Sequence, residues 1–228
     1  DYEHTHPLTD ALASKFYSVE ADVYFHDGSI AVSHDGLDFK GTLDALYLDP
    51  LEQRVDATGS VYGDGAPFTL WIDIKDGSST LQDALAGKLA TYAMLTRSFD
   101  DHVEPHAVNV ILTGDANAKR ALVERREPRP YSRDDNDFHI DDAQIDTAWT
   151  SYALAWSDYV GWDGHGTVSD ADRQRLVCIV DGAHDNGRPV RMFATPETPA
   201  YWQLALDVGE DFINTDDLPG LSRFLDAH

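Results

Sequence analysis

The chain has 228 residues, 42% of them hydrophobic, with 41 acidic and 17 basic side chains and a formal net charge of −24. This composition is that of a folded globular protein, and the charge argues against nucleic acid or an anionic membrane as a partner held by surface charge. One cysteine, Cys178, excludes an intramolecular disulfide or a cysteine zinc site, and no apolar run approaches the roughly 20 residues that span a bilayer.

The first third of the chain predicts a helix, a hairpin and a second helix. A helix from Leu8 to about Lys15 precedes an apolar, β-branched strand that starts at Phe16, and a turn at His26–Gly28 leads into the second strand of the hairpin. The apolar spacing from Thr42 to about Ala57 predicts an amphipathic helix with Thr42 as its N-cap. A Gly-rich loop follows at Gly59–Pro67.

Strands and helices alternate through the rest of the chain. We expect strands at 68–75, 107–112, 130–132, 151–156, 189–194 and 211–214, and helices at 79–97, 116–125, 169–186, 199–208 and 218–227. This alternation is typical of βαβ units and a parallel sheet. Because polar and acidic residues gather where the strands end, we expect a (β/α)8 TIM-type barrel in a single domain, 1–228. A doubly wound open sheet is the alternative, but no G-x-G-x-x-G turn supports it.

Candidate ligands for a cation lie in the opening hairpin. Glu20 and Asp22 are two residues apart on one strand, so their side chains project from the same face. Two such carboxylates suit a hard cation such as Mg²⁺ or Ca²⁺. His34, just past the second strand, can reach the same site as a proton donor or acceptor. An ordinary edge hairpin with polar residues in water would show the same pattern.

The next strand supplies Asp73 and Lys75, two residues apart on the face opposite Leu70, Ile72 and Ile74. A buried Asp or Lys is costly without a partner. Asp73 beside Glu20 and Asp22 would complete a cation site, and Lys75 would suit the oxygens of a phosphate. A purely structural Asp73–Lys75 ion pair is the alternative.

In this order, these motifs resemble the glycerophosphodiester phosphodiesterase / phosphatidylinositol phospholipase C-like superfamily, in its microbial branch. Asp73, where glycerophosphodiesterases usually have Glu, is also similar to the sphingomyelinase D-type phospholipases. The resemblance covers nearly the whole chain: it rests on Pro7, Val19–Val23 (VEADV), His34–Asp35, Asp73–Lys75, Val190–Pro196, Trp202 and Ile213–Asp217.

The resemblance implies a role for each matched residue. Glu20, Asp22 and Asp73 would bind Mg²⁺ or Ca²⁺, His34 would be one half of a general acid–base pair, and Lys75 would hold the phosphate. The partner would be a small phosphodiester or a lipid head group, which places the protein in lipid metabolism. A cyclic phosphate is a common intermediate or product in such enzymes.

One departure from the pattern concerns the N-terminus. The first catalytic His of the family would stand two residues before Asp1, and the first barrel strand would lie further upstream. We therefore expect the barrel to be N-terminally incomplete in this chain. A seven-stranded barrel that has lost one catalytic His is the alternative, with His4 and His6 as nearby substitutes. Because the chain does not begin with Met, a processed upstream segment is expected, which favours secretion.

Other acidic and aromatic residues are weaker candidates. Asp158 and Trp162, in SDYVGWDGHG, could line the substrate pocket, or they could belong to a Gly-rich loop with aromatic packing. The run Asp134–Asp137 could bind Ca²⁺, but we expect a solvated acidic loop. The imbalance of 33 Asp against 5 Lys fits either a saline environment or an ordinary acidic protein.

The sequence thus favours a metal-dependent phosphoric diester hydrolase that acts on a glycerophosphodiester or a phospholipid-like substrate. A non-catalytic barrel that binds a phosphorylated ligand or cation is the alternative from a different class. A weaker alternative is an aldolase with a Schiff base on Lys75. The neighbouring carboxylates argue against the aldolase, because they favour the protonated form of that lysine.

Overall fold

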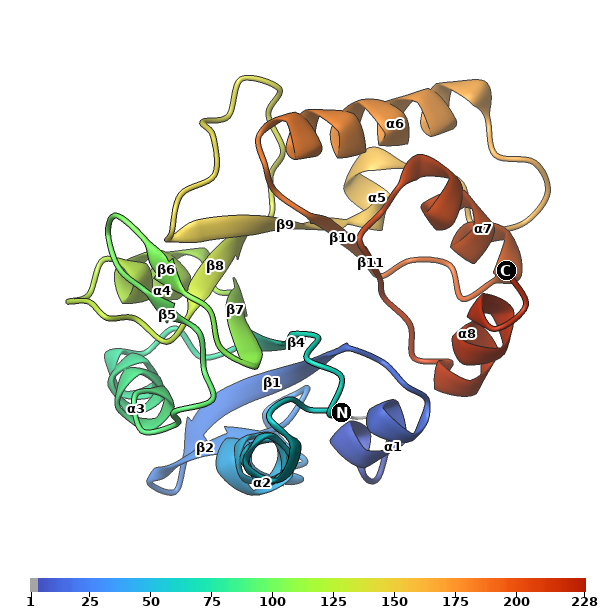
Figure 1. Ribbon diagram of the computed structural model, residues 1–228. Helices are drawn as coiled ribbons and strands as arrows, with labels where there is room; N and C mark the ends of the chain where they lie inside the picture. Colours follow the sequence, from blue (N-terminus) through green and yellow to red (C-terminus); the bar gives the residue numbers. More distant parts are fainter. Residues whose placement is uncertain (1–3) are drawn as a thin grey trace. The chain divides into compact units, whose positions relative to one another are not determined.

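A computed structural model describes residues 4–228 of the chain (Figure 1). They divide into two compact units, the first ending at Arg133 and the second running from Asp134 to His228. Each unit combines parallel strands with helices, as the alternating pattern predicts. The expectations of a (β/α)8 barrel and of a single domain stay predictions.

The first unit is built on a mostly parallel sheet. From one edge its strand order is β8 (Ser132–Asp135, which runs across the unit boundary), β7 (Val108–Gly114), β4 (Phe68–Ile74), β1 (Ser18–His26), β2 (Ser29–Val32) and β3 (Gly41–Thr42). β8, β7, β4 and β1 are parallel, whereas β2 and β3 add to β1 as an antiparallel hairpin. The predicted hairpin and central strands are therefore confirmed.

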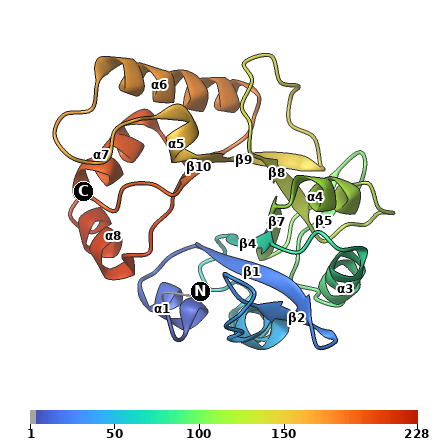
Figure 2. The ribbon, with the colours of Figure 1, turned by 180° about the vertical axis from the view of Figure 1, so that it is seen from behind.

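Helices cover one face of this sheet. Figures 1 and 2 show α2, α3 and α4 on the same side of β1, β4 and β7. In chain order the unit holds α1 (Pro7–Ala13), the π-helix η1 (Asp44–Leu48), α2 (Asp49–Thr58), α3 (Ser79–Leu89), the small hairpin of β5 (Arg97–Ser98) and β6 (Val103–Glu104), and α4 (Ala116–Val123). Ser78 caps α3 by accepting from the amide of Leu81, and Asp115 caps α4 in the same way.

The two faces of β4 differ as the alternation predicts. Leu70, Ile72 and Ile74 are at most 1% exposed and form the core under the helices. Asp73 lies on the opposite face and is only partly buried. This division places acidic side chains on the face of the sheet away from the helices.

The second unit holds three parallel strands and four helices. Its strand order is β9 (Trp149–Ala155), β10 (Val190–Phe193) and β11 (Phe212–Ile213), and its helices are α5 (Trp156–Tyr159), α6 (Asp170–Asp185), α7 (Pro199–Val208) and α8 (Leu218–Leu225). Arg188 is 1% exposed, lies 3.6 Å from the centre of the Trp149 ring and donates to the carbonyls of Ala143, Gln144 and Trp149. It thereby fixes the loop before β9.

Two helix predictions need correction. The helix predicted at 79–97 ends at Leu89, because the following residues find tertiary partners: the Tyr92 hydroxyl donates to Asp49, and the Arg97 guanidinium donates to the carbonyl of Tyr92. The helix predicted from Thr42 begins with a π turn instead of an α turn, although Thr42 Oγ1 does accept from the Ala45 amide.

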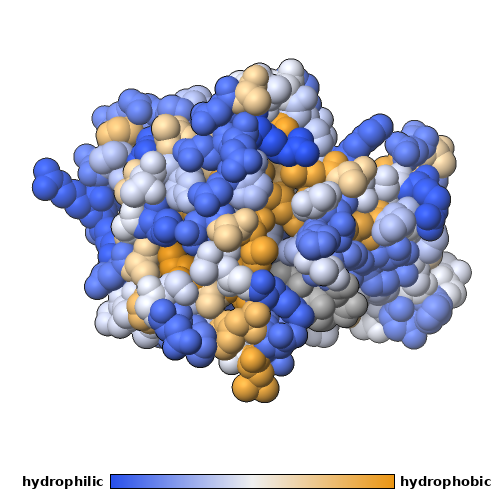
Figure 3. Space-filling view, turned by 90° about the horizontal axis from the view of Figure 1, so that it is seen from below, coloured by the Kyte–Doolittle hydropathy of each residue, from blue (hydrophilic) through white to orange (hydrophobic). Residues whose placement is uncertain are grey.

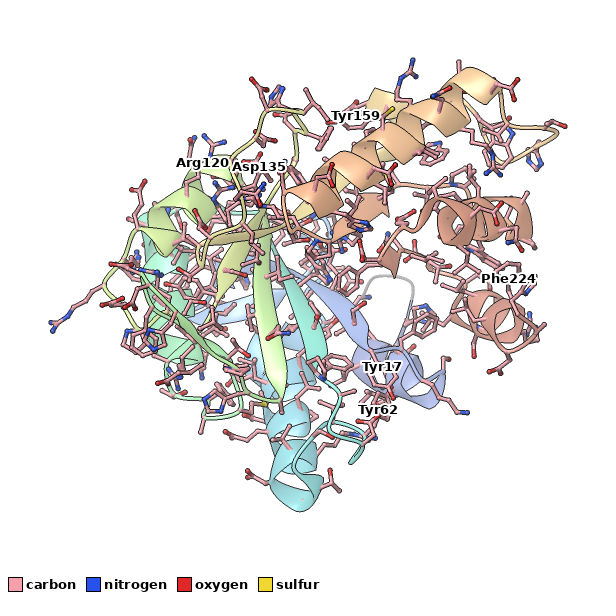
Figure 4. The ribbon with its side chains drawn as sticks, turned by 45° about the horizontal axis from the view of Figure 1, so that its top comes forward. Tyr17, Tyr62, Arg120, Asp135, Tyr159 and Phe224 are labelled. Carbon is pink, nitrogen blue, oxygen red and sulfur yellow. The ribbon has the colours of Figure 1, made fainter. Side chains whose placement is uncertain are left out.

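Hydrophilic side chains cover much of the face drawn in Figure 3, with hydrophobic ones between them. At the N-terminal end of β1, Tyr17 and Tyr62 lie side by side (Figure 4), with ring centroids 4.7 Å apart. In residues 4–228, no helix is both long enough and apolar enough to cross a membrane.

Candidate metal centre

Three carboxylates meet where β1 and β4 run side by side. Asp22 and Asp73 are direct partners across the two parallel strands, and Glu20 lies two residues before Asp22 on the same face. One oxygen from each carboxylate lies within 4.8 Å of the other two. Within the part of the chain that the structure describes, no other group of three or more His, Cys, Asp or Glu side chains is arranged this closely.

Lys75 is the counter-ion of this cluster. Its Nζ atom lies 2.7 Å from Asp73 Oδ2 and 3.3 Å from Asp22 Oδ1. Burial by itself would lower the pKa of Lys75, but the hydrogen bond to Asp73 and the charges of Asp73 and Asp22 outweigh burial and raise the pKa. The ammonium group therefore stays charged, which argues against the Schiff-base alternative.

The carboxylates remain crowded despite this lysine. Burial, together with the charge of Glu20, raises the pKa of Asp73 to about 6, although the hydrogen bond to Lys75 and the charge of Lys75 lower it. Three carboxylates face one ammonium, so the cluster carries excess negative charge. A further cation would relieve this repulsion.

His34 reaches the cluster from the hairpin. Its Nδ1 atom lies 3.0 Å from Asp22 Oδ2, and the imidazole is 48% exposed. The backbone brings it there because the Ser33 amide donates to the Asp22 carbonyl, directly after β2 ends. Asp22 is thus the shared partner of His34 and Lys75, one through each carboxylate oxygen.

The loop after His34 is held by Asp35. Its Oδ1 atom accepts from the amides of Leu37, at 2.9 Å, and Asp38, at 3.2 Å, and these hydrogen bonds lower the pKa of Asp35. Gly36 has φ +72° and would bring a Cβ atom to 3.1 Å from the Tyr24 ring, so glycine suits this turn. The sequence prediction used Asp35 only as part of a His-Asp motif and missed this turn, although Asp-Gly is a turn signal.

The donor set fits a hard divalent cation. All three side chains offer carboxylate oxygens, which Mg²⁺ and Ca²⁺ prefer, and the local charge is negative. Neither sulfur nor imidazole ligands, which favour Zn²⁺, belong to this group of three. Asp22 is 7% exposed, so it anchors the cluster from the inside, whereas Glu20 and Asp73 stand at its partly open side.

Asp158 and Trp162 belong to the second unit. Asp158 is exposed on α5, and Trp162 follows in the loop after that helix. The Trp162 indole donates to the carbonyl of His165 at 2.7 Å, and the Trp162 carbonyl accepts from the indole of Trp156 at 2.8 Å. These hydrogen bonds hold the loop after α5, and a substrate contact of Asp158 or Trp162 stays a prediction.

The remaining candidates are His4, His6 and the run Asp134–Asp137. His4 Nδ1 is 3.8 Å from Asp10 Oδ2, and His6 is an exposed residue at the start of α1. In the run Asp134–Asp137, the expectation of a solvated loop is wrong for Asp134, which is fully buried at β8. The expected upstream histidine lies outside the sequence.

Comparison with known proteins identifies the family. A family model of the AIM6-like phosphodiesterase domain matches residues 1–131, which is more than half of the chain and includes all five residues of the cluster and its partners. The chain belongs to this family.

Two curated relatives extend the similarity to nearly the whole chain. Altered inheritance of mitochondria protein 6 from Lachancea thermotolerans is 28% identical, over 96% of this chain and 62% of the relative. The protein of the same name from Eremothecium gossypii is 24% identical, over 98% of this chain and 67% of the relative. The chain therefore spans about 62% of the length of the first relative. No solved structure matches the chain.

Proposed function

We propose that this AIM6-like domain is a metal-dependent phosphoric diester hydrolase that acts on a glycerophosphodiester or a phospholipid-like substrate. One observation carries the proposal: Asp22 and Asp73 lie in register, Glu20 completes the oxygen cluster, and His34 and Lys75 both contact Asp22. The family name supports phosphodiester chemistry. The sequence resemblance to the glycerophosphodiester phosphodiesterase / phospholipase C-like superfamily supports the substrate class and the barrel architecture.

Glu20, Asp22 and Asp73 are the residues that would hold Mg²⁺ or Ca²⁺. When bound, such a cation neutralises the charge of the diester and orients it. Lys75 adds a second positive charge on the same side, where its Nζ atom can bind a phosphate oxygen at a short distance from Asp73. A substrate phosphate would thus meet positive charge from two sources.

His34 would carry one of the two proton transfers. In hydrolysis an oxygen nucleophile, either water or a substrate hydroxyl, forms a bond to phosphorus and gives up a proton. The bond from phosphorus to the leaving oxygen breaks, and that oxygen takes a proton. Asp22 accepts a hydrogen bond from the Nδ1–H group of His34, so Nε2 is the nitrogen that would exchange protons with the substrate. The resemblance expects a second histidine for the other transfer.

The test is turnover of glycerophosphocholine and of bis-p-nitrophenyl phosphate by the full-length protein with Mg²⁺ or Ca²⁺. We expect Glu20→Gln and His34→Ala to reduce kcat/KM at least ~100-fold. Asp83→Asn is the matched control, because it removes a carboxylate that pairs with Arg125 at 2.8 Å in the same unit. Its activity should equal that of the parent.

The variants separate the proposal from its alternative. Full activity of Glu20→Gln would refute the assignment of the cluster as the active site. A parent that binds Mn²⁺ at Glu20 but turns over neither substrate would support the non-catalytic, ligand-binding barrel instead.

A further inference from the structure

Tyr47 lies directly behind the carboxylate cluster. Its side chain is 0% exposed, and its hydroxyl donates to the backbone carbonyl of Glu20 at 3.3 Å. This contact joins the helical layer to the backbone of a cluster residue. The residue belongs to η1, the π turn that precedes α2.

The Glu20 carbonyl points to the same edge of β1 as β2, at a position that β2 does not reach. The carbonyl of Tyr17, just before β1, accepts from Thr69, and that of Val23 accepts from Lys75, just after β4. The carbonyl of Asp22 points the other way and accepts from Ser33. The carbonyl of Glu20, two residues before Asp22, shares its direction. The β1–β2 register begins only at Val23, so the strand partner stops short of Glu20. The Tyr47 hydroxyl donates to the Glu20 carbonyl where a backbone amide of a neighbouring strand would otherwise donate.

The π turn is what directs Tyr47 to this point. Pro50 has no amide hydrogen, and its ring clashes with the carbonyl four residues earlier in a regular α-helix. The Asp49 amide donates to the carbonyl of Asp44, five residues back, which is the π pattern. The Tyr92 hydroxyl, at 2.6 Å from Asp49 Oδ1, ties this turn to the segment after α3.

Tyr47 acts as a neutral donor. Burial raises its pKa well above the ordinary value, and the negative charges of Asp22 and Glu20 raise it further. In the hydrogen bond to Glu20 the hydroxyl is the donor, and a donor is what a backbone carbonyl requires.

We propose that Tyr47 is a positioning residue for the metal centre, because its hydroxyl fixes the β1 backbone between Glu20 and Asp22 and so sets the spacing of their carboxylates. This inference rests on the proposed function of the cluster. Partners behind metal ligands commonly change metal affinity or activity by about 10–100-fold when they are removed.

The experiment compares Tyr47→Phe with Tyr131→Phe. Tyr131 is also buried in the first unit, and its hydroxyl donates to a backbone carbonyl, that of Leu122, at the same distance of 3.3 Å. Both variants lose one hydroxyl and keep the ring. Mn²⁺ binding, followed by the electron paramagnetic resonance signal of the free ion, should be about 10-fold weaker in Tyr47→Phe and unchanged in Tyr131→Phe. Saturating metal should restore kcat.

Pro50→Ala is the second variant, and it keeps the inference testable if Tyr47→Phe does not fold. It restores an amide hydrogen, allows a regular α turn and should move Tyr47 off Glu20, so Mn²⁺ binding should again weaken. The inference would be overturned if Tyr47→Phe and Tyr131→Phe bound Mn²⁺ with equal affinity. If Tyr47→Phe does not fold, it would be overturned if Pro50→Ala bound Mn²⁺ with the affinity of the parent. Failure of the proposed function looks different: the parent would bind no Mn²⁺, would bind it without turning over either substrate, or would keep its Mn²⁺ affinity in Glu20→Gln.

Discussion

Asp22 and Asp73 stand directly opposite each other on two parallel strands, and the Lys75 ammonium lies within 3.3 Å of a carboxylate oxygen of each. Two buried or partly buried carboxylates with oxygens within 4.8 Å of each other repel. Lys75 neutralises part of this charge, and the negative charge that one lysine leaves on three carboxylates is what the proposed cation would neutralise.

Removal of Lys75 should separate metal binding from turnover. In Lys75→Met the cluster loses its internal cation, so we expect Mn²⁺ to bind at least as tightly while kcat/KM falls ~100-fold. Without metal, the free energy of unfolding should fall by about 1–3 kcal/mol, since Asp22 and Asp73 lose their partner.

The control is Lys88→Met, which breaks another Lys–Asp pair of the same unit, with Asp44 at 3.0 Å. It should lower stability slightly and leave kcat/KM unchanged. Weaker Mn²⁺ binding in Lys75→Met than in Lys88→Met would contradict this description of the cluster.

The turn held by Asp35 should control turnover without controlling metal affinity. Asp35→Ala removes the acceptor for the amides of Leu37 and Asp38, so His34 loses its fixed approach to Asp22. We expect kcat to fall about 10-fold with Mn²⁺ affinity within about twofold of the parent. Asp64→Ala, which removes a similar acceptor for the Ala66 amide, is the control. If Asp35→Ala lost as much Mn²⁺ affinity as Glu20→Gln, the Asp35 turn would control metal binding as well as turnover, and this prediction would be wrong.

A buried carboxyl in the second unit should make stability depend on pH. Burial raises the pKa of Glu210 to about 8, although the Met192 amide and the Tyr201 hydroxyl donate to it. The folded state therefore holds a proton that the unfolded state releases near pH 4.5. The free energy of unfolding should fall as the pH rises from about 4.5 to 8 and then level off.

Glu210→Gln removes this proton linkage and keeps an oxygen acceptor. The free energy of unfolding of Glu210→Gln minus that of the parent, measured by urea unfolding, should rise by on the order of 2–4 kcal/mol from pH 5 to pH 8.5. Parallel stability curves for the two proteins over this range would show that Glu210 does not titrate as described.

Salt should stabilise the folded chain. A net charge of −24 produces self-repulsion in the compact state. Raising NaCl from 0.1 to 1 M shortens the screening length from about 10 Å to about 3 Å, so the thermal unfolding midpoint should rise. A midpoint that is insensitive to salt would argue against adaptation to a saline environment.

The strands that hold the site were predictable because alternation is a local property. Glu20 and Asp22 on one strand, and Asp73 and Lys75 on another, each share a face by the two-residue period, and parallel pairing then brings the two pairs together. The short loop that follows β2 was enough to predict that His34 would lie nearby.

Tertiary partners account for what the sequence did not predict. The residues after Leu89 have helical spacing, but Arg97 and Tyr92 form contacts outside the helix and end α3 early. Tyr47 looks like an ordinary apolar anchor of an amphipathic helix, and only the π turn before Pro50 directs its hydroxyl to Glu20. Such a contact has no pattern in the sequence.

The most direct test of the central claim is the metal dependence of phosphodiester turnover in the parent and in Asp73→Asn. The full-length protein is stripped with EDTA, and hydrolysis of glycerophosphocholine is followed as Mg²⁺ or Ca²⁺ is added back. We predict no activity without metal, a saturable return in the parent, and at least ~100-fold less activity in Asp73→Asn at any metal concentration. Activity that resists EDTA, or parental activity in Asp73→Asn, would contradict a metal-dependent phosphodiesterase centred on Glu20, Asp22 and Asp73.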